Sequence, residues 1–156
     1  MQNIKKILFP VDLSEVAPKI ASWVRILADK FEAEVHLLFV ARTMGQYVGI
    51  HVPFAAVSDF ESEIVKGAEQ SLLEFVQANF PDRQVVFKVA SGYPADEILN
   101  YAEAKGMDLI IMGTHGRKGL ERIFFGSVAE NVVKRSQIPV LTVNPFRMAA
   151  TAEAEE

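Results

Sequence analysis

Residues 113–127 read Gly-Thr-His-Gly-Arg-Lys-Gly-Leu-Glu-Arg-Ile-Phe-Phe-Gly-Ser, and this stretch decides how the chain is organised. It follows the apolar run Leu-Ile-Ile-Met at residues 109–112 and precedes a helical pattern over residues 128–135. The pattern therefore predicts a buried strand, a glycine-punctuated loop and a helix. Free N–H groups and the positive end of the dipole at a helix start suit an anion, most often a phosphate. We expect this loop to hold the phosphates of a nucleotide.

Strands and helices alternate in the rest of the chain. Short runs rich in aliphatic and β-branched residues predict strands over residues 6–11, 34–40, 84–90, 108–112 and 139–143. Between them, apolar residues recur at helical spacing, as at Ile20, Val24 and Ala28. Residues 41–57 have no clear period and predict a long irregular connection. The alternation indicates an α/β fold with a mainly parallel sheet.

Capping signals set the expected helix boundaries. Ser14 is the expected N-cap of the first helix, with Glu15 and Pro18 in its first turn. Ser58 and Glu61 have capping-box spacing, so a second helix is expected to start there and to close before residue 81, a proline. A third helix should run from residue 94, a proline, to about residue 105, where a glycine follows.

Size and composition point to one globular domain. The chain has 156 residues, of which 50% are hydrophobic and 23% charged. We expect one domain over residues 1–146 and a frayed tail over residues 147–156, which carry little that could be buried.

Charge and hydropathy exclude several classes of protein. The net charge of −4 argues against electrostatic capture of nucleic acid. With no cysteine, the chain has no disulfide and no thiol chemistry. No apolar run approaches the roughly 20 residues that span a bilayer, and no signal segment is evident at the N-terminus. We expect a cytoplasmic protein without a membrane partner.

The glycine loop matches neither common nucleotide fingerprint. It lacks G-x-x-x-x-G-K-[ST], and no G-x-G-x-x-G follows the first strand. What it carries is Gly113-x2-Gly116-x9-Gly126-Ser127. Gly116 can take positive φ in a turn, and Gly126 with Ser127 would leave N–H groups and a hydroxyl open to phosphate oxygens. The alternative is that these glycines only form turns.

The expected topology adds a carboxylate to the same site. Ligands of open α/β sheets bind outside the carboxyl ends of the strands, where the strand order reverses. Asp12 follows the first strand and Gly113 ends the fourth, so the two would share one crevice if these strands are neighbours. The alternative is that Asp12 is a helix cap beside Ser14.

Four segments resemble the universal stress protein family, and together they cover nearly the whole chain. They are Ile7-Leu8-Phe9-Pro10-Val11-Asp12-x-Ser14, residues 108–116, Gly126-Ser127-Val128-Ala129-Glu130, and residues 138–143. The Gly-x2-Gly-x9-Gly-Ser pattern is the one associated with the family's ATP-binding branch. The resemblance implies a Rossmann-like, open five-stranded parallel sheet of order 3-2-1-4-5, with helices on both faces.

The resemblance also implies a nucleotide site for ATP, or for AMP or ADP. Asp12 would bind the adenosine part with the Val40 backbone near adenine, and Met112 and Gly113 would lie along the ribose. The implied nucleotide-binding set is Pro10, Val11, Asp12, Val40, Met112, Gly113, His115, Gly116, Arg117, Gly126, Ser127 and Val128. Position 129 is alanine where some relatives carry a hydroxyl, so one phosphate donor is missing.

Family members dimerise through their last strands, which here implies a homodimer through Val140–Val143. The three histidines are scattered, so no metal held by side chains is expected, whereas Mg²⁺ or Mn²⁺ would be bound through the phosphates.

No nucleophile with its base is evident, and no carboxylate is placed to orient an attacking water. The expected function is therefore regulatory, with an unidentified protein partner and at most weak ATP hydrolysis. A slow ATPase, an AMP-selective sensor and a nucleotide-free dimeric scaffold stay open as alternatives.

Overall fold

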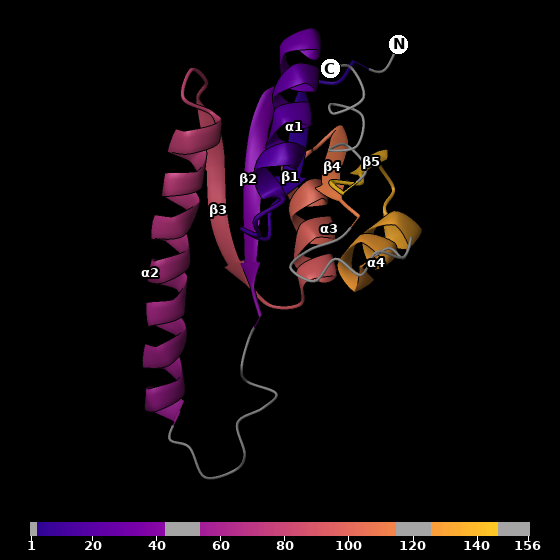
Figure 1. The fold of residues 1–156 in the computed structure, drawn as a ribbon. Coiled ribbons are helices and arrows are strands. Elements are labelled where there is room, and N and C mark those ends of the chain that lie inside the picture. Colours follow the sequence, from indigo (N-terminus) through magenta and orange to yellow (C-terminus); the bar gives the residue numbers. More distant parts are fainter. Residues whose placement is uncertain (1–2, 43–53, 115–125, 147–156) are drawn as a thin grey trace.

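A computed structural model describes residues 3–42, 54–114 and 126–146 of the chain (Figure 1). Strands and helices alternate along it, as the sequence predicts. Their bounds are β1 Lys6–Pro10, α1 Ala17–Phe31, β2 Glu34–Ala41, α2 Phe54–Asn79, β3 Val85–Ser91, α3 Pro94–Lys105, β4 Leu109–Gly113, α4 Ser127–Arg135 and β5 Val140–Val143. Each expected strand, and the helices α3 and α4, begin and end within one residue of these bounds.

The strands form one five-stranded sheet in the order β3-β2-β1-β4-β5, and every neighbouring pair is parallel. This confirms the predicted fold. β1 lies in the middle, and Ile7 and Leu8 are fully buried there. An apolar run without alternation is what a strand covered on both faces requires.

Helices cover both faces of the sheet, and successive residues of β1 show which helix lies where. Ile7 and Phe9 belong to a core cluster that contains α1 and, through Leu72, α2. Leu8 belongs to a second cluster with Ile98 of α3 and Val132 of α4. Because side chains of a strand alternate between faces, α1 and α2 cover one face, and α3 and α4 cover the other. Figure 1 shows the same two layers.

The start of α1 differs from the prediction. The N-cap is Val16, without a side-chain capping bond, and no acidic residue lies in the first turn. Ser14 and Glu15 therefore precede the helix, whereas Pro18 lies in its first turn as expected. The reason is a local turn: the Ser14 N–H donates to Asp12 Oδ1 at 3.0 Å, and Leu13 has a left-handed φ of 59°. This turn moves the N-cap of the helix two residues further along the chain, from Ser14 to Val16.

The start of α2 was also predicted wrongly. The helix begins at Phe54, so Ser58 and Glu61 lie inside it and are not a capping box at its start. The proline at residue 53 of the sequence was the better signal, because proline favours the first turn of a helix. The expected irregular connection is shorter by residues 54–57, and its part over residues 43–53 lies outside the described residues.

Among the described residues, no helix is long and apolar enough to cross a membrane.

Candidate functional site

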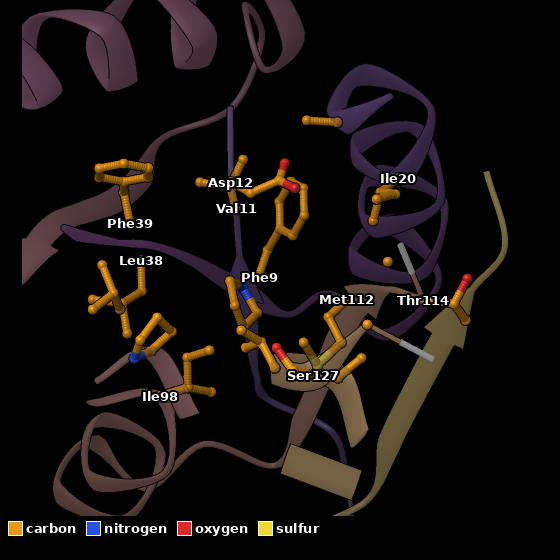
Figure 2. A pocket seen from close by; sticks show the side chains of 18 of the residues that line it. Phe9, Val11, Asp12, Ile20, Leu38, Phe39, Ile98, Met112, Thr114 and Ser127 are labelled. Carbon is orange, nitrogen blue, oxygen red and sulfur yellow. The ribbon is translucent and has the colours of Figure 1, made fainter. Parts of the chain in front are cut away.

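A cleft of about 370 Å³ opens at the carboxyl ends of β1, β2 and β4 (Figure 2). This volume is in the range of small-molecule sites. The cleft also lies where the strand order reverses, because β1 has β2 as its neighbour on one side and β4 on the other. In Figure 2, Leu38, Phe39 and Ile98 lie on one side of the cleft and Thr114 on the opposite side.

The sequence-predicted site residues that the structure describes meet at this cleft. Those that line it are Pro10, Val11, Asp12, Val40, Met112, Gly113, Gly126, Ser127 and Val128. The other three, His115, Gly116 and Arg117, lie outside the described residues. Segments more than 100 positions apart in the chain are thus brought to one cleft by the pairing of β1 with β4.

Asp12 lies beyond the end of β1 with an exposed side chain. Its Oδ1 accepts the Ser14 N–H at 3.0 Å, which fixes the carboxylate in the turn that leads to α1. The alternative prediction of a helix cap is wrong, because the N-cap of α1 is Val16. The left-handed Leu13 in the same turn is an uncommon conformation for a residue with a branched side chain, and such residues cluster at ligand sites.

The start of α4 forms the wall of the cleft away from Asp12 (Figure 2). Gly126 is its N-cap, and the Gly126 N–H donates to the carbonyl of Thr114 at 2.7 Å, so this group is not open as the sequence suggested. The first intrahelical bond is from the Glu130 N–H to the Gly126 carbonyl at 3.0 Å. The N–H groups of Ser127 and Val128 precede it and have no acceptor inside the helix. They are the donors that this wall offers to an anion.

Sequence reasoning missed several residues of the cleft. Pro94 and Ile98 of α3, Thr114 after β4, and Arg42 after β2 also line it. Arg42 and Thr114 follow strand ends and Pro94 starts a helix, so the rule that ligands bind beyond strand ends could have found these three. Ile98 lies one turn inside α3, and no local signal marked it. Of the described lining residues, Asp12 and Arg42 are the two that carry charge.

A second polar cluster lies away from the cleft, toward the start of β2. The buried His36 contacts the Tyr101 hydroxyl through Nδ1 at 2.7 Å and the Glu34 carboxylate through Nε2. The hydrogen bond from His36 holds the pKa of Glu34 below its usual value, and burial raises the pKa of Tyr101. No group of three or more His, Cys, Asp or Glu side chains among the described residues could hold a metal ion.

Comparison with known proteins places these features in a family. Residues 3–144 match the model of the universal stress protein family. A universal stress protein of Methanocaldococcus jannaschii is 39% identical over 141 residues, which cover 89% of this chain and 81% of that protein. A second universal stress protein from the same organism is 35% identical over 154 residues, which cover 89% of this chain and 94% of that protein. The solved structure of that second protein superposes with a TM-score of 0.76, covering 92% of this chain and 97% of the other.

Two more distant structures were solved with nucleotides. One is a universal stress protein in complex with cAMP, at 19% identity and a TM-score of 0.60 over 92% of this chain and 99% of that one. The other is the universal stress protein from Archaeoglobus fulgidus in complex with dAMP, at 17% identity and a TM-score of 0.62 over 92% of this chain and 100% of that one. At these identities the likeness shows the shared fold.

Proposed function

The chain belongs to the universal stress protein family, and we propose that it is a regulatory protein that binds an adenine nucleotide, with ATP as the expected ligand, in the cleft between β1 and β4. One observation carries the proposal: a carboxylate, Asp12, and a helix start, Ser127 of α4, line the same cleft of about 370 Å³ and lie apart in it (Figure 2). An acceptor for hydroxyl or amino groups and a set of donors for an anion are what a nucleotide requires.

The phosphates would lie at the start of α4. The N–H groups of Ser127 and Val128 and the Ser127 hydroxyl are suited to phosphate oxygens, and the helix dipole favours their negative charge. Gly126 supports this assignment because a Cβ there would come within 3.3 Å of the Thr114 carbonyl. His115, Gly116 and Arg117 complete the proposed cradle from outside the described residues.

The adenosine would occupy the remainder of the cleft. Asp12 accepts from it, the Val40 backbone lies near adenine, Pro10 and Val11 form the wall at the end of β1, and Met112 and Gly113 lie along the ribose. An apolar lining around few polar groups is typical of small-molecule sites, and Leu38, Val40, Ile98 and Met112 provide it here. The cAMP and dAMP complexes of distant members support an adenine base.

The carboxylates of the described cleft support a regulatory role in place of rapid catalysis. Asp12 is the carboxylate that lines the cleft within the described chain, and it lies across the cleft from α4. It is therefore not placed to orient a water at the terminal phosphate of a nucleotide whose phosphates lie on α4. Mg²⁺ or Mn²⁺ would be held by phosphate and water, and would neutralise phosphate charge.

A second candidate ligand is an adenosine monophosphate. It is favoured by the two complexes named above, in each of which the nucleotide has a single phosphate. Binding of AMP at least as tightly as ATP would favour this ligand, because the distal phosphates would then make no favourable contact.

We also propose a homodimer through β5. Val140–Val143 is an edge strand of the sheet, and Leu141 on it is 38% exposed. Pairing two copies of this strand would satisfy its open backbone groups.

Thermal unfolding with and without ATP and Mg²⁺ tests the proposal. At a ligand concentration about 100-fold above Kd, binding stabilises the folded state by about 2.7 kcal/mol, which raises Tm by roughly 5–10 °C at this size. The same titration with AMP separates the two candidate ligands. The absence of any shift with either nucleotide would refute the proposed function.

A further inference from the structure

We propose that Arg42 determines which ligands the cleft accepts, by stacking its guanidinium group on the nucleobase. The inference rests on the proposed nucleotide site and adds to it a residue that the family motifs quoted above do not contain. Arg42 is exposed, directly follows β2, and lines the cleft.

The strand places Arg42 on the side of the sheet where α3 lies. Leu38 and Val40 of β2 pack with the cluster that contains α3, and Arg42 follows at the same spacing of two residues. Since side chains two apart on an extended strand point to one face, Arg42 continues this row beyond the sheet.

The neighbouring strand β3 brings the start of α3 close to Arg42. Ala41 pairs with Ser91 of β3, and the Gly92 N–H donates to the Ala41 carbonyl at 3.0 Å. Two residues later Pro94 begins α3 and lines the cleft, as does Ile98 one turn further on. Arg42 therefore lines the same part of the cleft as Val40, Pro94 and Ile98.

Arg42 differs from three other arginines of the described chain. Within the described parts of the chain, no hydrogen bond or ion pair engages its guanidinium group, whereas Arg25, Arg83 and Arg135 are each bound to a carbonyl or a carboxylate. Asp12, the other charged residue of the described lining, lies just after the neighbouring strand β1. Asp12 and Arg42 do not form an ion pair with each other.

The position of Arg42 favours the base over the phosphates. β1 lies between β2 and β4 in the sheet. The backbone of Arg42, at the end of β2, is therefore two strand spacings, about 10 Å across the sheet, from the end of β4, where the chain leaves toward α4. The nearer surface is apolar and suits a flat ring. A guanidinium group is planar and stacks on aromatic faces, which an ammonium group does less well. A purine offers a larger face than a pyrimidine, so the contact selects for purines.

Calorimetric titration with adenosine, AMP and ATP tests the inference on wild type and on Arg42→Ala. We expect Arg42→Ala to weaken all three ligands by the same factor, about 3- to 30-fold, because all three share the base. Arg42→Lys should recover little of the loss, and CMP should bind the wild type more weakly than AMP. Lys30→Ala, on the exposed surface of α1, is the control for the loss of one positive charge and should leave binding unchanged.

The outcomes separate this inference from the proposed function. If wild type and Arg42→Ala bind ATP equally well, the role of Arg42 is overturned and the nucleotide site stands. A loss confined to AMP and ATP, with adenosine unaffected, also overturns it, because it shows a phosphate contact. Wild type that binds none of the three ligands refutes both. Circular dichroism and Tm of the variants check that an exposed substitution leaves the fold unchanged.

Discussion

The carbonyl oxygen of Thr114 accepts the Gly126 N–H at 2.7 Å, and it would lie 3.3 Å from a Cβ on the same glycine. This contact joins the end of β4 to the start of α4 and sets the position of the helix start in the cleft. Gly126 has φ −57° and ψ 154°, which other residues adopt readily. Space, and not backbone conformation, is therefore what requires glycine here.

Gly126→Val should abolish the ATP-dependent rise in Tm, because its branched side chain would clash with the Thr114 carbonyl and displace the start of α4, which lines the cleft. Gly126→Ala should weaken binding less, since a single Cβ at this distance requires a shift of only a few tenths of an ångström. Gly67→Ala is the control: nothing lies within 4 Å of its Cβ, and the change should stabilise α2 by about 0.5–1 kcal/mol. A normal thermal shift in Gly126→Val would contradict the role of this wall.

Asp12→Asn should weaken nucleotide binding by about 10- to 100-fold while leaving Tm without ligand nearly unchanged. The amide oxygen can still accept the Ser14 N–H, so the turn survives, whereas the charged acceptor for the adenosine part is lost. Asp12→Ala should lose both the turn contact and the binding. Calorimetry and thermal unfolding measure the two effects separately; equal affinity in wild type and Asp12→Asn would remove Asp12 from the site.

Tyr101→Phe should destabilise the fold by about 1–3 kcal/mol, because it leaves the buried His36 Nδ1 without its partner at 2.7 Å. Chemical unfolding measures the loss. Tyr93→Phe is the matched control, since Tyr93 is 53% exposed and should change stability by less than about 0.5 kcal/mol. Similar effects of the two variants would mean that the His36 contact contributes nothing.

The stabilising effect of Glu34 should depend on pH. The bond to His36 holds the pKa of Glu34 below 4.5, so folding favours the carboxylate. Its contribution is present above pH 4.5 and is lost as pH falls through the lowered pKa. Glu34→Gln should therefore be less stable than wild type near pH 7, with a difference that shrinks in acid. Glu103→Gln, on the exposed side of α3, should show no such trend; a difference that grows in acid would contradict the assignment.

Leu141→Lys should convert the proposed dimer to a monomer, because a lysine on an edge strand opposes strand pairing. Light scattering coupled to size-exclusion chromatography measures the mass directly. Ile26→Lys, at an exposed position of α1 and not on the edge strand, should leave the mass unchanged. A wild-type monomer would exclude the dimer.

The sequence predicted most of the fold because its signals are local. A buried strand such as residues 7–9 needs an unbroken apolar run, and the end of α3 needs the glycine that follows it, Gly106, which adopts a φ of 62°. Ser14 and Ser58 failed as helix starts for a related reason. Both carry a capping signal that the chain around them overrides, one through the turn at Asp12 and the other through a helix that has already begun at Phe54.

The sequence alone determined the order of strands and helices along the chain and the parallel sheet, and it proposed Asp12, Gly113 and Gly126 as site residues. Only the tertiary structure decided how these residues meet. It placed Arg42 and Ile98 in the same cleft and turned the Gly126 N–H toward Thr114. The physical reason is that strand periodicity and helix signals are read within a few residues, whereas a cleft depends on which strand ends the sheet brings together.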